Sequence, residues 1–198
     1  MFKRVALVLV ALALLAFVGC AKAPEAEMQK ANSAIEAART AEAETYAPES
    51  FRVANDTINA AMAAKQEADG KFSLFRSYTK AKEMFVRADE LANKAAADAA
   101  TEKENVRIQV GQKLLDVKAV LDSAQVALNK APRGKGTKAD IALFKSDLDA
   151  AGAAYAEADA DYAGGKYMIA RTKLDGVLER ARAVMQQIEV AKAKKMAK

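Results

Sequence analysis

The chain has 198 residues and a formal net charge of +5, and its 52% of apolar residues are enough to form a sizeable core. Alanine supplies 48 residues, about a quarter, against 3 prolines, 9 glycines and no tryptophan, a balance that favours helix over sheet. With no histidine and a single cysteine, the chain lacks the commonest general base, the usual zinc ligands and any internal disulfide. We therefore expect a non-catalytic protein without a metal or cofactor.

The first 19 residues have the pattern of a secretory signal. Two basic residues precede an unbroken apolar run of 14 residues at positions 5–18, which is shorter than the roughly 20 residues that span a membrane. The stretch that ends at Cys20 resembles the lipobox of bacterial lipoproteins, with Phe17 where leucine is usual. The resemblance implies that residues 1–19 are removed and that Cys20 becomes the lipidated first residue. An ordinary signal or an uncleaved anchor, with an incidental cysteine, is the alternative.

A lipid on Cys20 would attach the chain to a membrane. Lipoproteins of this kind usually carry three acyl chains, enough for stable anchoring. The next residue is Ala21 rather than aspartate, and by the sorting rule of enteric bacteria this resembles an outer-membrane destination. We therefore expect a periplasm-facing lipoprotein of the bacterial outer membrane, with residues 20–25 as lipidated cysteine and tether. Anchoring in the inner membrane and a soluble periplasmic protein are the alternatives.

The charge of the mature chain argues against nucleic acid as a partner. Residues 1–19 contain two basic residues and no acid, so their removal lowers the formal net charge from +5 to +3, which is 29 bases against 26 acids. So small a charge over 179 residues is not the basic surface of a nucleic-acid-binding protein.

Beyond the tether, apolar residues recur alternately three and four positions apart, as in helices that pack in a bundle or coiled coil. This spacing, with the breaks at proline and glycine, predicts helices near 25–46, 49–69, 72–131, 138–163 and 166–195. The helix over 72–131 is either continuous or broken near residues 100–105, where charges replace apolar residues. Three of the clearest series are Tyr78, Ala81, Phe85, Ala88, Ala92, Ala95 and Ala99; Ile141, Phe144, Leu148, Ala151, Tyr155, Ala158 and Tyr162; and Tyr167, Ala170, Leu174, Val177, Ala181, Val184, Ile188 and Ala191.

The two halves of the chain resemble each other at offsets of 90 and 89 residues. We therefore expect an all-α fold, an elongated antiparallel helical bundle or coiled coil of two tandem three-helix units, residues 26–100 and 101–198, that share the long central helix. This topology resembles that of spectrin-type repeats, whereas the period of about 34 residues of tetratricopeptide repeats is not found. The matched pairs include Phe51 with Ile141, Ile58 with Leu148, Tyr78 with Tyr167 and Phe85 with Leu174.

Residues 43–49 read Ala-Glu-Thr-Tyr-Ala-Pro-Glu and are followed by an alanine-rich helix and by Gly70-Lys71. This arrangement resembles a domain-of-unknown-function family of alanine-rich bacterial envelope lipoproteins, whose members carry a Tyr-Ala-Pro-Glu element between helices. The resemblance covers about residues 26–98. It implies a helical fold and a place in the cell envelope, and some relatives join such a segment to an OmpA-like peptidoglycan-binding domain.

Three tyrosines form the one candidate binding site. Tyr155 and Tyr162 lie two helical turns apart, and Tyr167 follows across the predicted turn. We expect tyrosines at such positions to pack in the core, with a groove for a peptide, glycan or lipid as the alternative. The acidic residues between 147 and 161 are expected to form a solvated helix face, and residues 134–138 a solvated loop that lacks the spacing of a phosphate-binding loop.

These patterns together predict a structural or scaffolding role in the envelope. The expected partners are the membrane, through the lipid on Cys20, and another envelope protein or peptidoglycan. Self-association is expected if the long helix leaves an apolar face exposed.

Overall fold

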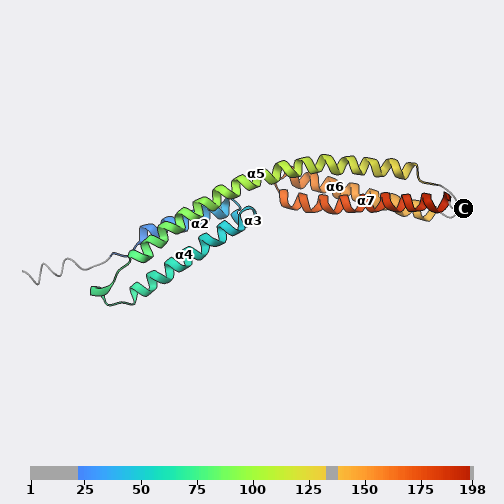
Figure 1. Cartoon of the computed structure of the whole chain (residues 1–198). Helices are drawn as coiled ribbons and strands as arrows, with labels where there is room; N and C mark the ends of the chain where they lie inside the picture. Colours follow the sequence, from blue (N-terminus) through green and yellow to red (C-terminus); the bar gives the residue numbers. More distant parts are fainter. Residues whose placement is uncertain (1–21, 133–137, 197–198) are drawn as a thin grey trace, which may run out of the picture. The chain divides into compact units, whose positions relative to one another are not determined.

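The computed structural model of the protein describes residues 22–132 and 138–196 (Figure 1). Within these residues it is built of helices and contains no strand, so the predicted all-α fold is confirmed. Contacts divide the chain into two compact units, of which unit 1 ends at Glu102 and unit 2 begins at Lys103. The helices are α2 (Glu25–Thr40), α3 (Ala43–Tyr46), α4 (Pro48–Asp69), the short 3₁₀ helix η1 (Ser73–Phe75), α5 (Thr79–Asn129), α6 (Lys138–Ala163) and α7 (Tyr167–Met196).

Unit 1 consists of α2, α3, α4, η1 and the first part of α5. Lys82 Nζ pairs with Glu27 Oε1 at 3.0 Å, which places the start of α5 beside the start of α2. At the other end of the unit, Ser50 Oγ donates to Asp98 Oδ2 at 2.6 Å, so the start of α4 lies beside a later turn of α5. Helices α2 and α5 therefore run in the same direction and α4 runs opposite to both (Figure 1).

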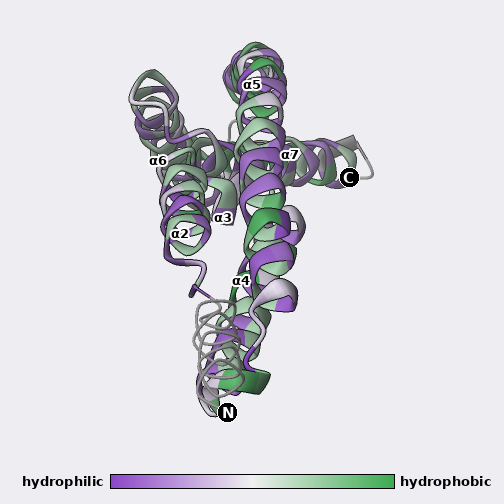
Figure 2. Ribbon diagram, turned by 90° about the vertical axis from the view of Figure 1, so that its left-hand side faces the viewer, coloured by the Kyte–Doolittle hydropathy of each residue, from purple (hydrophilic) through white to green (hydrophobic). Residues whose placement is uncertain are grey.

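The core of unit 1 is made largely of alanine, at the spacing that the sequence predicts. Small side chains let helices approach closely, but each buries little apolar surface. Figure 2 shows hydrophilic and hydrophobic residues alternating along the ribbon of the helices, as expected when one face of each is buried. The buried residues of this unit include Ala31, Ile35, Ala38, Phe51, Ala54, Ile58, Ala61, Tyr78, Ala81, Phe85, Ala88, Ala92, Ala95 and Ala99.

Unit 2 consists of the second part of α5 with α6 and α7. Larger apolar side chains from all three helices form one cluster at the end of the unit where α5 ends and α6 begins. In the opposite half of the unit, Lys113 of α5 forms an ion pair with Asp175 of α7. The buried members of the cluster are Ala124, Leu128, Ala131, Phe144, Leu148, Ala181, Val184 and Ile188.

Matched positions of the two units are similar in some pairs, although Ile141 and Tyr167 are only half-buried where their counterparts Phe51 and Tyr78 are buried. Phe85 and Leu174 are both completely buried. At the other extreme, Val53 and Leu143, which match at the offset of 90, are both exposed. In these last two pairs, each unit thus buries or exposes the same place of the repeated pattern.

Two predicted helices differ from those observed. The helix expected over 25–46 is broken after Thr40, because Glu42 adopts a left-handed conformation with φ of 59°, and its carbonyl accepts the N–H groups of Thr45 and Tyr46 at the start of α3. The helix expected over 72–131 begins only at Thr79.

The long helix shows no break near residues 100–105. Ala99, Val106 and Val110 are all buried, so the buried face continues through the charged stretch. Most of the charged residues there occupy the outward positions of an unbroken α5.

Candidate functional site

The predicted lipidation site, Cys20, lies outside the described residues, as do residues 134–137 of the loop predicted over 134–138, whose last residue, Lys138, begins α6. The first described residues nevertheless show where the N-terminal segment meets the fold. Lys22 and Pro24 line an open hollow of about 690 Å³ together with residues 76–79, which lead into α5. The N-terminal end of the described chain and the junction between α4 and α5 therefore lie at the same end of unit 1.

The junction between α4 and α5 carries the most exposed large apolar side chains of the described residues. Phe72, Leu74 and Phe75, here called the apolar tip, are 68%, 70% and 80% exposed. The 3₁₀ turn is closed by a hydrogen bond from the Phe75 N–H to the Phe72 carbonyl at 2.9 Å. The two phenylalanine rings lie 6.5 Å apart, centre to centre.

Two side chains hold this junction in place. Arg76 Nη2 donates to the carbonyls of Asp69 at 2.9 Å and Lys71 at 3.1 Å, capping the last turn of α4. The Tyr78 hydroxyl donates to Asp69 Oδ1. This hydrogen bond and a second one from Lys65 hold the pKa of Asp69 below its usual value. The same contact with Asp69, together with burial, raises the pKa of Tyr78.

The sequence analysis missed the apolar tip because it assigned these residues to the following helix. Leu74 lies four positions before Tyr78 and continues the alternating spacing of three and four, but Phe72 and Phe75 fall outside it. That departure, directly after Gly70, is the signal that could have revealed a turn. The contacts of Arg76 and Tyr78 with α4 are tertiary and have no sequence pattern.

Replacing Tyr78 with phenylalanine should flatten the pH dependence of stability at both extremes. A lowered pKa of Asp69 stabilises the fold above its unfolded value, and this contribution is lost as the pH falls below about 4. A raised pKa of Tyr78 stabilises the fold below its unfolded value, and this contribution is lost as the pH rises above about 10. The difference in melting temperature between wild type and Tyr78→Phe should therefore be largest near neutral pH, measured by circular dichroism.

Tyr155→Phe is the matched control for this experiment. The Tyr155 hydroxyl donates to the Leu114 carbonyl at 3.3 Å, a group that does not titrate. Tyr155→Phe should leave the acid limb of the stability profile unchanged. A difference between wild type and Tyr78→Phe that stays constant from acid to alkaline pH would contradict the role of the Asp69 contact.

Tyr155 and Tyr162 contact α5, and Tyr162 also contacts Tyr167. Besides its hydrogen bond to Leu114, Tyr155 is half-buried, and this burial raises the pKa of its hydroxyl. The ring of Tyr162 lies 5.4 Å from that of Tyr167. The structure therefore brings Tyr162 and Tyr167 together across the turn, while Tyr155 packs on α5. The groove remains a prediction.

Gly111 explains how Tyr162 approaches α5 so closely. A Cβ atom at Gly111 would stand 2.9 Å from the hydroxyl oxygen of Tyr162, closer than Cβ atoms are found. The absence of a side chain at Gly111 thus provides the space that the tyrosine fills.

The acidic stretch of α6 forms ion pairs rather than a cluster of carboxylates. Lys173 Nζ of α7 lies 2.8 Å from Asp161 Oδ2 and 3.0 Å from Glu157 Oε2. These contacts lower the pKa of Asp161 and raise that of Lys173. Among the described residues, no three His, Cys, Asp or Glu side chains are grouped so that they could hold a metal ion.

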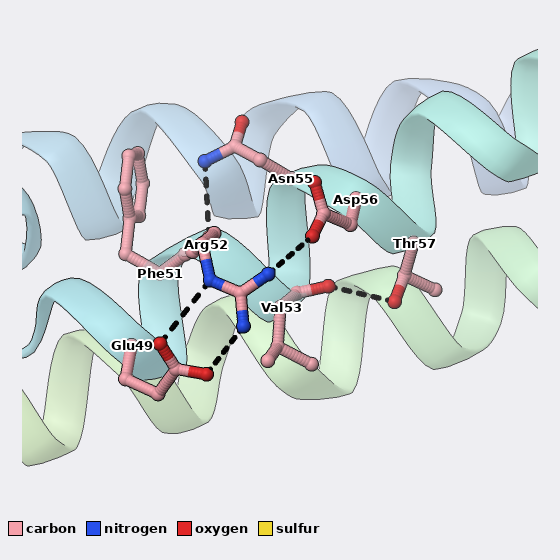
Figure 3. Close-up of polar contacts among 7 residues, drawn as sticks. All are labelled: Glu49, Phe51, Arg52, Val53, Asn55, Asp56 and Thr57. Carbon is pink, nitrogen blue, oxygen red and sulfur yellow. Dashed lines mark hydrogen bonds and ion pairs between the residues drawn. The ribbon is translucent and has the colours of Figure 1, made fainter.

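A second polar group lies on the exposed face of α4 (Figure 3). Arg52 stands between Glu49, with an Nη2–Oε1 distance of 2.5 Å, and Asp56, with an Nη1–Oδ2 distance of 2.9 Å. Both acids lie within about one turn of Arg52 on the same helix, so the group supports the first turns of α4. All three side chains are more than half exposed, so water screens these ion pairs and each contributes little to stability.

Comparisons with protein-family models, curated proteins and solved structures found no match to this chain. The resemblance to the envelope lipoprotein family therefore rests on the residues that carry it, 43–49 above all. Within residues 22–132 and 138–196, none of the helices combines the length and apolar character that crossing a membrane requires.

Proposed function

We propose that the chain is a lipid-anchored lipoprotein that faces the periplasm from the bacterial outer membrane and has a structural or scaffolding role without catalysis. The observation that carries the proposal is the position of the only cysteine. Cys20 follows two basic residues and a 14-residue apolar run at the distance that a lipoprotein signal requires. The lack of histidine in the whole chain supports a role through contact rather than acid–base chemistry.

The surface of the helices supports the same proposal. Ion pairs between residues three or four apart lie on the outward faces of α4, α5 and α6, as on helices that stay solvated. Ile108 and Leu115 of α5 are 57% and 66% exposed and lie seven positions apart. Seven residues are nearly two helical turns, so the two side chains share one face of α5. Such a face suits contact with another envelope component.

Replacing Cys20 with serine should abolish the anchor. We expect wild-type protein from bacterial membranes to begin at Cys20 with a mass increased by acyl chains, and Cys20→Ser to remain unprocessed or to leave the membrane fraction. The measurement is intact mass spectrometry of membrane and soluble fractions. Ala21→Ser is the control, because it makes a similarly small change at the next residue and should leave acylation unaffected.

Two outcomes would contradict the lipoprotein proposal. An unmodified Cys20 behind an intact segment of residues 1–19 would indicate an inner-membrane tether. Cleavage at another position would indicate a soluble periplasmic protein.

A further inference from the structure

Three apolar side chains are exposed together at one end of unit 1. Single exposed apolar residues are normal on protein surfaces, but Phe72, Leu74 and Phe75 are the most exposed large apolar residues of the described chain and fall within four positions. Arg76 and Tyr78 fix the backbone that carries them through hydrogen bonds to α4. The fold therefore presents the apolar tip in a defined position.

Basic residues flank the apolar tip. Residues 70–82 contain four basic residues and no acidic one: Lys71, Arg76, Lys80 and Lys82. Lys22, at the beginning of the described chain, lines the adjoining hollow with Arg76. Acidic residues of this end lie on α2 and α4, where Glu27 pairs with Lys82 and Glu67 pairs with Lys71, and on α5, where Glu83 lines the same hollow as Lys22. The sequence around the tip is thus suited to the phosphate groups of anionic lipids.

Only a few residues separate the proposed attachment point from the described end of unit 1. Pro24 follows Cys20 by four positions, and that length of chain spans at most about 14 Å. Pro24 lines the same hollow as residues 76–79, at the end of unit 1 where η1 lies (Figure 1). A lipid on Cys20 would therefore hold this end of the unit next to the bilayer.

The size of the apolar tip favours lipid over protein as its contact. A stable protein interface takes roughly 20–30 residues on each side, far more than three side chains at the end of a turn. A bilayer interface, in contrast, accepts a few phenylalanine and leucine side chains flanked by basic residues.

We propose that the apolar tip inserts into the surface of the membrane that holds the chain, as a second contact beside the N-terminal lipid. The inference rests on the proposed function, because the lipid on Cys20 is what would bring a membrane to this end of unit 1. With two contacts, the end of unit 1 would be held against the bilayer at two points. The basic residues at 71 and 76 would lie at the level of the lipid phosphates.

The absence of tryptophan from the chain allows a site-specific test. Phe75→Trp introduces a single tryptophan into the apolar tip, and Val53→Trp introduces one near the opposite end of α4, where Val53 is 37% exposed. Each full acylated variant, extracted from membranes, is reconstituted in vesicles of phosphatidylglycerol and phosphatidylethanolamine with brominated acyl chains. We expect the tryptophan emission of Phe75→Trp to shift to the blue and to be at least halved by bromine, and that of Val53→Trp to be unaffected.

Three results would overturn the inference. An unshifted emission of Phe75→Trp, while the chain floats with the vesicles, would show that the tip stays in water. A blue shift without quenching by bromine would show that protein, such as a second copy, covers the tip. Equal quenching of Phe75→Trp and Val53→Trp would show that the unit lies on the bilayer without a preferred contact.

The same samples separate this inference from the proposed function. The intact mass reports whether Cys20 carries lipid, and bromine quenching reports whether the apolar tip enters the bilayer. An acylated Phe75→Trp variant without quenching would refute the insertion of the apolar tip and leave the lipoprotein proposal intact. A quenched Phe75→Trp variant with an unmodified Cys20 would refute the lipoprotein proposal and support the insertion of the apolar tip.

Discussion

Replacing Phe85 with alanine is expected to lower the free energy of unfolding of unit 1 by about 3–5 kcal/mol. Phe85 is completely buried and is the one side chain of unit 1 among the largest fully buried side chains of the described residues. Its neighbours along the buried face of α5 are Ala81 and Ala88. Alanine side chains are too short to close the space that a lost phenylalanine ring leaves, so the cavity should persist and place the cost in the upper part of the range.

Phe75→Ala makes the same chemical change at an exposed position of the same unit. Phe75 is 80% exposed, so in the purified protein its replacement should change stability by no more than about 0.5 kcal/mol. Urea unfolding followed by circular dichroism compares the two variants. Equal effects of Phe85→Ala and Phe75→Ala would contradict the assignment of Phe85 to the core of unit 1.

The buried faces of the helices could be predicted from the sequence because helix periodicity is a local property. Tyr78, Phe85 and Leu174 were expected on these faces, and Phe85 and Leu174 are completely buried. Apolar residues alternately three and four positions apart indicate a helix that packs along one side. The pattern remains visible where these residues are alanine.

The breaks at proline and glycine were predicted, but the break at Glu42 and the late start of α5 at Thr79 were not, since they depend on contacts between helices or on an unfavourable backbone conformation. The break at Glu42 places a residue with good helix propensity in a left-handed conformation, and nothing in the local sequence signals it. The turn before α5 is fixed by Arg76 and Tyr78 reaching back to Asp69. A single sequence does not show such tertiary hydrogen bonds.

Of the two candidate sites, one could be predicted from the sequence and the other could not. Cys20 is found from the sequence alone, because its signal is a linear pattern. The apolar tip is found only from the structure, because Phe72 and Phe75 become conspicuous when their exposure is known. The two observations meet at one end of unit 1 through Lys22 and Pro24.

Replacing Leu174 with alanine should lower the free energy of unfolding of unit 2 by about 2–5 kcal/mol. Leu174 of α7 is completely buried and occupies the position that matches Phe85 at the offset of 89. The control is Leu143→Ala, which makes the same change where the side chain is 58% exposed and should cost no more than about 0.5 kcal/mol. Hydrogen exchange measured by mass spectrometry assigns the effect to α6 and α7.

Combining Leu174→Ala with Phe85→Ala tests whether the two units are energetically independent. Each unit is held by its own internal contacts, so the two losses should add within about 0.5 kcal/mol. Phe85→Ala should then increase hydrogen exchange in α2 and α4 but not in α6 or α7. Faster exchange in α6 and α7 of the Phe85→Ala variant would instead mean that α5, which belongs to both units, transmits the loss of core packing from one unit to the other.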